Sequence, residues 1–499
     1  MPAWVRVVLV ACLAAGLTLR AESLRWRAAW YDEVYSLWLT SHSVPTIVRE
    51  SATSDPHPPG YYLLLAGWRR IVGTGLGAAR TLSLMLWGAA LLLLWHAVRS
   101  WFGWRVAAGA TMLLSVHAFQ VIASTEARMY MALQLAAVGS TWLLWRALEG
   151  GHDSRLWAAY GLGATIMMYL SYYSIFLLIA QAAFVVARLR WAVWGRPLAA
   201  AGIIVVAYSP WLRFLGGSVG SNTVPWRPPP DADYMASVLM SQAYGGHFLG
   251  AAGYYGGELR GAGEAALGLV PLGFVLVGFL TLLRSHRKAA WLVAWCWAVP
   301  LGIAVAGSFL LGKVAAFAYH LTYLQPFAAV LAAGSMLHLW SPGETTRRRL
   351  FSLGAAVVLL GYSAAGADAA WRDPRYQPFR PDLLASYLRR LSQQDDTVLY
   401  MPQGMRRAVE LYYVPPARVA EIRFGLAAWV RGEIQGSVTA AREALATAGP
   451  RVWVVAGYPL PPGAVEEVAK AARELGYVLG PVAEFGGLRV GLLVRRSRL

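Results

Sequence analysis

The sequence predicts a mainly α-helical membrane protein that ends in a small α/β domain. Of its 499 residues, 57% are hydrophobic and only 14% are charged, whereas about a quarter of an ordinary globular protein is charged. Long apolar stretches recur from the N-terminus to about residue 367 and then stop. The remaining residues alternate short segments of helical and strand periodicity. We therefore predict a transmembrane helical bundle over residues 1–367 and a soluble α/β domain over residues 368–499.

The apolar stretches predict about eleven spans, because a spanning helix needs roughly 20 apolar residues. The first stretch resembles a signal peptide, but Arg20 interrupts any small-residue cleavage site, so we interpret it as a membrane helix. Residues 61–72 are too few to cross and are expected to form an interfacial helix. The predicted spans are 4–19, 77–98, 106–122, 129–146, 156–172, 173–190, 198–215, 265–283, 289–311, 320–340 and 350–367.

The charge pattern orients these spans. The net charge is +18, and with a cytoplasmic N-terminus most basic residues outside the first outer segment fall in short inner loops, as the positive-inside rule requires. Attraction to anionic headgroups or to a phosphate-bearing substrate is the alternative explanation of the charge. The hydropathy argues against a nucleic-acid binder. In this orientation the outer face receives the long loop 216–264, the C-terminal domain and every polar residue singled out below.

Several kinds of chemistry have no signal in the sequence. Cys12 and Cys296 both lie in apolar spans and suit neither a disulfide framework nor a structural zinc site. No GxSxG, HExxH, GxGxxG or P-loop motif is present. A divalent cation on Asp32, Asp55 and His57 is not supported by their spacing, so we expect no metal and no cofactor.

Asp32 and Glu33 are the first candidate catalytic residues. The usual interpretation of such a pair is a solvated helix start. The aromatic neighbours Trp30, Tyr31 and Tyr35 instead place it in the interfacial belt, where a carboxylate meets both water and lipid. There a carboxylate can accept a proton from an acceptor hydroxyl as a general base.

Asp55 and His57 lie in the run Asp-Pro-His-Pro-Pro. Each proline fixes its own φ and pushes the preceding residue toward extended geometry. We therefore expect a rigid, extended arm that holds a substrate-binding pair, the alternative being a simple helix stop-and-start signal.

Glu126, Arg128 and Tyr130 open the fourth predicted span. A helix start favours an acid through the macrodipole, which is the structural alternative. The functional hypothesis is that Glu126 positions a substrate while Arg128 binds a phosphate through two parallel hydrogen bonds.

Four further residues complete the predicted substrate site. Tyr172 and Tyr173 are either interface anchors or sugar-stacking groups. Lys313 and His320 flank an outer loop, where they either contact an anionic headgroup or serve as a snorkelling lysine and a capping histidine.

The C-terminal domain is predicted to contain a mostly parallel sheet. Helices are expected at 383–393, 406–413 and 464–475, and strands at 397–401 and 451–456. Residues 482–494 read as a hairpin with a Gly-Gly turn at 486–487.

Three motifs in this order carry a resemblance: the acidic pair after the first span, then HPPGYYLLL, then EARMY. Over residues 25–190 the chain resembles membrane glycosyltransferases of the GT-C superfamily, most of all family 39, which includes protein O-mannosyltransferases and lipid A aminoarabinose transferases. The resemblance implies transfer of a sugar, with inversion, from a polyprenyl-phosphate donor to an acceptor at the extracytoplasmic face. It makes Asp32 the base and Glu126 the second acidic position. Where relatives often have an arginine before a later span, this chain has Ala318-Tyr319-His320.

The partners expected are therefore a lipid-linked sugar, a glycan, lipid or protein acceptor, and the bilayer. Two alternatives stay open. A transporter or flippase of a lipid-linked sugar also needs many spans, but transporters usually place acids near the midplane and contain inverted repeats. The other is a non-catalytic lipid-binding or assembly protein whose C-terminal domain binds a partner.

Overall fold

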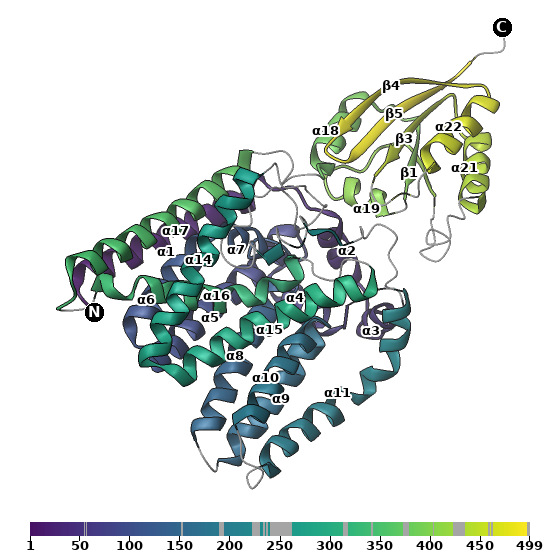
Figure 1. Cartoon of the computed structure of the whole chain (residues 1–499). Helices are drawn as coiled ribbons and strands as arrows, with labels where there is room; N and C mark the ends of the chain where they lie inside the picture. Colours follow the sequence, from purple (N-terminus) through teal and green to yellow (C-terminus); the bar gives the residue numbers. More distant parts are fainter. Residues whose placement is uncertain are drawn as a thin grey trace. The chain divides into compact units, whose positions relative to one another are not determined.

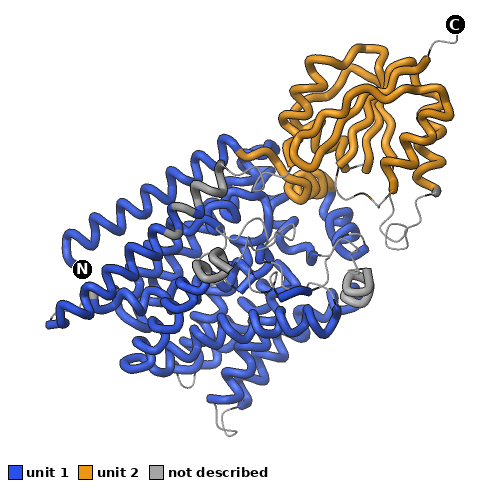
Figure 2. The backbone as a smooth tube through the Cα atoms, turned by 45° about the horizontal axis from the view of Figure 1, so that its top comes forward, with its two compact units in different colours: residues 1–26, 43–218, 228–373 blue, residues 27–42, 219–227, 374–499 orange. Residues whose placement is uncertain are grey.

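The computed structural model describes most of the chain. Outside the description lie residues 54, 56, 151–152, 189–193, 222–229, 233–234, 236–237, 240–261, 313–317, 341–342, 373–378, 403, 423–434, 458–459, 461–462 and 497–499, and the side chains at 215–221, 262–268, 339–340, 362, 365, 367–372 and 435. Two compact units are present (Figure 2): one contains residues 1–26, 43–218 and 228–373, and the other contains residues 27–42, 219–227 and 374–499. Most of the predicted outer loop 216–264 falls outside the described residues.

The first unit is helical (Figure 1). Its helices are α1 (Ala3–Trp26), α3 (Val44–Thr53), α4 (Gly60–Val72), α5 (Leu76–Phe102), α6 (Trp104–Val116), α7 (Ala118–Ala123), α8 (Tyr130–Glu149), α9 (Ser154–Leu170), α10 (Ser174–Arg188), α11 (Gly195–Ser221), α14 (Ala262–Ser285), α15 (Arg287–Leu311), α16 (Gln325–Ser335) and α17 (Thr346–Arg372), with the 3-10 helices η2 (Tyr319–Leu324) and η3 (Leu337–Trp340).

Helices occupy every predicted spanning range, but two of the ranges are not continuous α-helices. The range 106–122 breaks at His117, whose extended backbone ends α6 and whose Nδ1 accepts hydrogen bonds from the first amides of α7. The range 320–340 begins as η2 and becomes α-helical only in α16.

Four helices of the described chain are long and apolar enough to cross a membrane: Ala3–Trp26, Leu76–Phe102, Gly195–Phe214 and Arg287–Leu311. Shorter apolar helices are Trp104–Val116, Ser174–Arg188 and Leu269–Ser285. The total of eleven spans stays a prediction. Residues 60–72 form a helix where an interfacial one was predicted, whereas α2 (Tyr31–Leu39) and α3 were not predicted.

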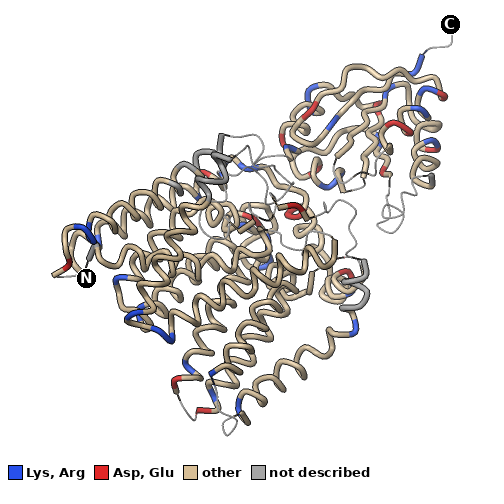
Figure 3. Tube along the Cα trace, viewed as in Figure 1, with Lys and Arg blue, Asp and Glu red and all other residues tan. Residues whose placement is uncertain are grey.

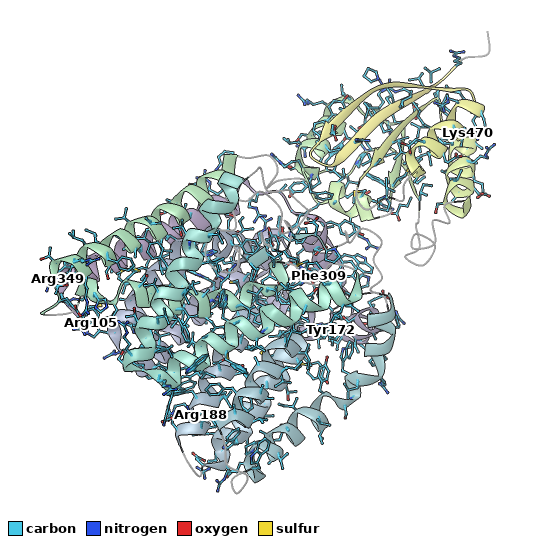
Figure 4. The ribbon with its side chains drawn as sticks, in the orientation of Figure 1. Arg105, Tyr172, Arg188, Phe309, Arg349 and Lys470 are labelled. Atoms are coloured by element: carbon cyan, nitrogen blue, oxygen red, sulfur yellow. The ribbon has the colours of Figure 1, made fainter. Side chains whose placement is uncertain are left out.

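Basic residues gather at one end of the helical unit (Figure 3). Arg105, Arg188 and Arg349 lie toward that end, and Tyr172 and Phe309 lie toward the opposite one (Figure 4). Glu149, at the end of α8, lies 3.5 Å from Arg188 and 3.9 Å from Lys288, so the ends of α8 and α10 meet the start of α15. This arrangement agrees with the predicted grouping of the short basic loops on one face.

The second unit contains a five-stranded sheet of order β2-β1-β3-β5-β4. Its strands are β1 (Thr397–Met401), β2 (Arg418–Glu421), β3 (Arg451–Ala456), β4 (Tyr477–Phe485) and β5 (Leu488–Arg495), and its helices are α2, α18 (Pro381–Leu391), α19 (Gly404–Glu410), α21 (Gln435–Thr447) and α22 (Ala464–Glu474).

The prediction of a mostly parallel sheet is wrong. Strand β1 pairs in parallel with β2 and β3, but β5 pairs antiparallel with both β3 and β4. The predicted Gly-Gly hairpin is present, and β5 enters the sheet beside β3. A two-residue hairpin makes its own strands antiparallel, and it leaves open which other strand either one will join.

Close packing of α14 on α16 depends on two glycines. A Cβ atom at Gly278 would overlap the Leu331 carbonyl oxygen, and one at Gly334 would lie 2.5 Å from the Gly278 carbonyl oxygen. Because neither backbone can move without separating the helices, the contact requires residues without side chains.

We expect Gly278→Ala to destabilise the bundle by about 1–3 kcal/mol, the usual cost of overpacking. Gly273→Ala on the same helix is the matched control, since a Cβ there meets no atom within 4 Å. It should leave stability unchanged or raise it by up to about 1 kcal/mol. Thermal unfolding of both variants in detergent measures the difference, and equal unfolding temperatures would contradict the packing argument.

Candidate functional site

Four buried or half-buried side chains form a closed ring of polar contacts in the helical unit. The Tyr62 hydroxyl donates to Asp55 Oδ2 at 2.6 Å and accepts from Arg128 Nη1 at 3.2 Å. His57 Nδ1 lies 2.7 Å from Asp55 Oδ1, and His57 Nε2 lies 3.5 Å from Arg128 Nη2. The structure thus brings together three of the predicted substrate-binding residues, Asp55, His57 and Arg128.

The protonation of this ring follows from its electrostatics. Burial by itself raises the pKa of Asp55, but the charge and hydrogen bond of His57, with Arg128 and Tyr62, outweigh burial and hold that pKa below its ordinary value. Asp55 is therefore ionised at neutral pH and can only accept hydrogen bonds. Because the Asp55 carboxylate is an acceptor, His57 Nδ1 donates to it.

Asp55 is bonded to the chain on both sides of it, and the predicted extended arm stays a prediction because residues 54 and 56 lie outside the described residues. The Asp55 amide donates to the Glu50 carbonyl at the end of α3, and the Asp55 carboxylate accepts from the His57 amide at 3.0 Å. Such side-chain closure of a turn is typical of aspartate. At Gly60 a Cβ would lie 2.5 Å from the Tyr169 carbonyl oxygen, so the glycine lets α4 start against the end of α9.

Arg128 and Glu126 lie in a buried irregular segment before α8, which begins only at Tyr130. The prediction that they open the helix is therefore wrong. Ser83 of α5 donates to the Glu126 carbonyl at 2.5 Å, and the Arg128 amide donates to the same oxygen at 2.8 Å. The side chains of Glu126 and Arg128 are almost fully buried, at 1% and 2% exposed, respectively.

Helix α1 holds the same segment from another side. Arg20, which is fully buried, donates to the Ser124 hydroxyl at 2.8 Å and to the Ser115 carbonyl at 2.6 Å. Ser23 and the Thr125 hydroxyl lie 2.7 Å apart. The loop that carries Glu126 and Arg128 is therefore fixed by two other helices.

An aromatic group lies beside the ring of polar contacts. His320 stacks on Tyr173 with ring centroids 4.5 Å apart and an interplanar angle of 11°. The His320 ring lies 5.6 Å from that of His57 and 6.2 Å from that of Tyr130. Tyr130, Tyr173 and His320 thus lie beside the ring of polar contacts, as a shared substrate site would require.

Two residues of the predicted substrate site, Tyr172 and Lys313, are not found beside the polar ring in the described part of the chain. The Tyr172 hydroxyl accepts from the Trp211 indole at 2.9 Å, and Tyr172 packs with Tyr208 and Trp211 in a separate aromatic cluster. Lys313 lies outside the described residues.

Asp32 and Glu33 belong to the second unit, in the first turn of α2. Glu33 is fully buried, and its Oε2 lies 3.4 Å from the Trp30 amide, as expected of a residue that caps its own helix. Asp32 is half-buried. Of these two neighbouring acids, only Asp32 is partly exposed to solvent.

Tyr62 and Arg20 were not predicted as part of the site. Tyr62 lies in the HPPGYY motif, but an apolar helix start gives no signal that one of two tyrosines bonds to an acid seven residues earlier. Among the described residues, no group of three or more His, Cys, Asp or Glu side chains is arranged to hold a metal.

An apolar groove of about 750 Å³ lies between α1, the end of α6 and α17, lined by residues such as Val8, Thr18 and Leu360. It contains none of the predicted site residues. Its position therefore does not identify the reaction centre.

The fold and the polar ring define a membrane protein whose ionisable groups converge at one part of a helical bundle. Residues 56–214 match the sequence model of the family described as dolichyl-phosphate-mannose-protein mannosyltransferase. That region contains His57, Tyr62, Glu126, Arg128 and Tyr173. Among curated proteins no sequence matches this chain.

Solved structures share the fold. ArnT from Cupriavidus metallidurans bound to undecaprenyl phosphate is 13% identical, with a TM-score of 0.61 and 97% of both chains covered. The oligosaccharyltransferase AglB of Archaeoglobus fulgidus, in complex with an inhibitory peptide and a dolichol-phosphate, is 15% identical, with a TM-score of 0.55, 98% of this chain covered and 74% of that one. The family model thus supports the predicted resemblance over residues 56–214, and the solved structures show that the fold is shared.

The lowered pKa of Asp55 predicts an acid-labile bundle. A carboxyl whose folded pKa is lowered contributes stability above its unfolded pKa of about 3.9 and loses that contribution as pH falls toward the folded value. We therefore expect the unfolding temperature of the wild type to fall below about pH 4. Asp55→Asn should be less stable near neutral pH and should show a weaker fall.

Thermal unfolding in detergent across the acid range measures this difference. Asp153→Asn is the control, because Asp153 is an exposed helix cap and Asn also caps well. Parallel pH profiles for the wild type and Asp55→Asn would show that the carboxylate makes no net contribution.

Proposed function

We propose that this chain is an inverting glycosyltransferase that moves a sugar from a polyprenyl-phosphate donor to an acceptor hydroxyl at the extracytoplasmic face. The observation that carries the proposal is the buried Arg128 guanidinium, oriented by Tyr62 and His57 within the region that matches the mannosyltransferase family. The ligands bound by ArnT and AglB, undecaprenyl phosphate and dolichol-phosphate, both present a phosphate on an isoprenoid chain.

Arg128 is assigned to the donor phosphate. A guanidinium donates two parallel hydrogen bonds to phosphate oxygens. A fixed cation in a site without bulk water stabilises the negative charge that develops on a leaving phosphate more than one in solution would. The contacts from Tyr62 and His57 fix the orientation of the guanidinium before the donor binds, so little reorganisation is needed during the reaction.

Asp32 is assigned as the base. The acceptor oxygen attacks the anomeric carbon, the bond from that carbon to the phosphate oxygen breaks, and the phosphate leaves with the electron pair. Asp32 takes the proton of the acceptor hydroxyl. Asp32 suits this role better than Glu33 because it is half-buried, whereas Glu33 is fully buried.

The other predicted residues receive supporting roles. Tyr130, Tyr173 and His320 offer aromatic faces beside the ring, which suits contacts with a sugar. Glu126 is assigned to substrate positioning. Lys313 and Tyr172 stay candidates for the donor headgroup and for the membrane interface, respectively.

Reconstitution with labelled donors tests the reaction class. Proteoliposomes receive a polyprenyl-phosphate sugar, with hexose and pentose versions tried in turn, and membrane extracts as acceptor. Covalent label on an acceptor together with released polyprenyl phosphate supports the proposal. Movement of intact donor between leaflets would identify a flippase instead, and binding without either event would identify a non-catalytic lipid-binding protein.

Asp32→Asn should lower kcat by about 10²–10⁴-fold, which is the range that general-base catalysis contributes. Binding of the donor should persist, because the variant removes only a proton acceptor. Transfer assays and donor-binding assays measure the two effects. Glu22→Gln, which changes a surface acid at the end of α1, should behave like the wild type, and near-normal turnover of Asp32→Asn would exclude Asp32 as the base.

Arg128→Ala should raise the KM for the donor by about tenfold or more, because a hydrogen bond to a charged group contributes about 1.5–3 kcal/mol. The KM for the acceptor should change little. Arg128→Lys should be intermediate, since it keeps the charge without the planar fork.

Arg105→Ala, in the first turn of α6, is the control. Unfolding temperatures separate lost binding from lost folding, because the alanine variant leaves Asp55 without its cation. An equal rise in both KM values would contradict the phosphate assignment.

A further inference from the structure

The helix that carries Asp32 packs on the C-terminal α/β domain. Helix α2 contacts α19, and both belong to the second unit. Tyr31, Tyr35 and Trp38 are spaced four and three residues apart, so they lie on one face of α2. The sequence pattern predicts that Tyr31 and Tyr35 lie in an interfacial belt, but in the structure Tyr31 and Trp38 contact α19 of the domain.

Three contacts with the C-terminal domain lie before and after Asp32 in the sequence. Before it, the Ala29 amide donates to the Tyr412 hydroxyl at 2.7 Å. Next to it, the Tyr31 ring lies so close to Gly404 that a Cβ there would be 2.7 Å from Tyr31 Cε2. After it, the Arg407 guanidinium lies 3.8 Å above the Trp38 ring, within the range of a cation–π interaction.

These contacts lie at the edge of the sheet where open α/β domains usually bind ligands. Gly404 follows β1, the strand from which the chain turns to β2 on one side and later to β3 on the other. Ligands usually occupy the crevice beyond the carboxyl ends of strands at such a point. Here Met405 is fully buried against Gly457 at the end of β3, and Tyr31 covers Gly404.

From this geometry we infer that α19 and Tyr412 of the C-terminal domain position the catalytic base by docking α2, with Gly404, Arg407 and Tyr412 as positioning residues. The inference rests on the proposed role of Asp32. It gives the C-terminal domain a part in the reaction without a ligand of its own. Asp32 and Arg407 also act electrostatically on the same group: burial and Asp32 raise the pKa of Tyr31, and Arg407 opposes them.

Positioning matters because a proton acceptor works only within hydrogen-bond reach of its donor. A misplacement of about 1 Å can cost about 10²-fold in rate. Loosening α2 should therefore lower kcat while leaving the donor KM unchanged, since the donor phosphate is assigned to Arg128.

Hydrogen exchange of the full-length protein in nanodiscs tests the docking itself, independently of any reaction. Arg407→Ala should increase exchange of the amides of residues 31–39. Arg406→Ala is the matched control, because the neighbouring arginine of the same helix pairs with Glu410 and Glu421 within the domain. Unchanged exchange in Arg407→Ala, or an equal increase in both variants, would overturn the inference.

Kinetics then test the effect on the base. Arg407→Ala should lower kcat by about tenfold or more, with an unchanged donor KM. Trp38→Ala should do the same, and the double variant should be no worse than either single one, because both remove one interaction. Multiplicative losses, or a kcat in Arg407→Ala equal to that of Arg406→Ala, would overturn the inference.

The two proposals fail differently. If the wild-type protein transfers no sugar from any donor, the proposed function fails, whatever the exchange data show. If the wild type transfers sugar and Arg407→Ala keeps its full kcat, the function stands and the positioning role is wrong.

Discussion

A buried arginine in an apolar bundle must be satisfied by the protein itself, and this constraint shapes the site. Arg128 meets it through the Tyr62 hydroxyl and the ring that Asp55 and His57 complete. Removing either charged group of the ring, Arg128 or Asp55, would leave the other charge buried without its partner, and such a change costs about 3–5 kcal/mol. The turn before α4 and the loop before α8, about 70 residues apart in the chain, are therefore held together by charge and hydrogen bonding, and neither can move alone.

The segment between α6 and α8, which contains the short helix α7 and irregular backbone on either side of it, is stable for a related reason. Non-helical backbone at membrane depth persists only where protein or a cavity covers it. Residues 117–130 are buried throughout. Gln120 donates to Gln134 of α8 at 2.6 Å and to Gln325 of α16 at 2.7 Å, while Arg20 and Ser23 bind from α1. Helices α1, α8 and α16 thus satisfy the segment, which presents Arg128 in one orientation.

Sequence patterns predicted what depends on local chemistry. Apolar periodicity located the helices, and ionisable residues beside apolar segments located Asp55, His57 and Arg128. The break at His117 was missed because the run 106–122 is mostly apolar, and that pattern does not reveal that the His117 side chain caps a new helix start. The docking of α2 was missed because Trp38 and Arg407 are distant in sequence, and aromatics beside acids are also typical of a membrane interface.

The geometry of the proposed displacement explains why the role of base is assigned to Asp32 and not to Asp55, although Asp55 is buried, ionised and close to the matched region. In an inverting reaction the acceptor attacks the face of the sugar opposite the leaving phosphate, so the base and the phosphate-binding cation act on opposite faces of the anomeric carbon. Asp55 is bound to Arg128 through Tyr62 and to His57 directly, which commits its carboxylate to the cation's side. Its lowered pKa also makes it a poor proton acceptor. Asp32 is half-buried and lies on a different element, α2, so it is free of this commitment to the cation's side. In the proposed reaction the rate therefore depends on the position of α2, which is why the contacts of α2 with the C-terminal domain have a chemical consequence.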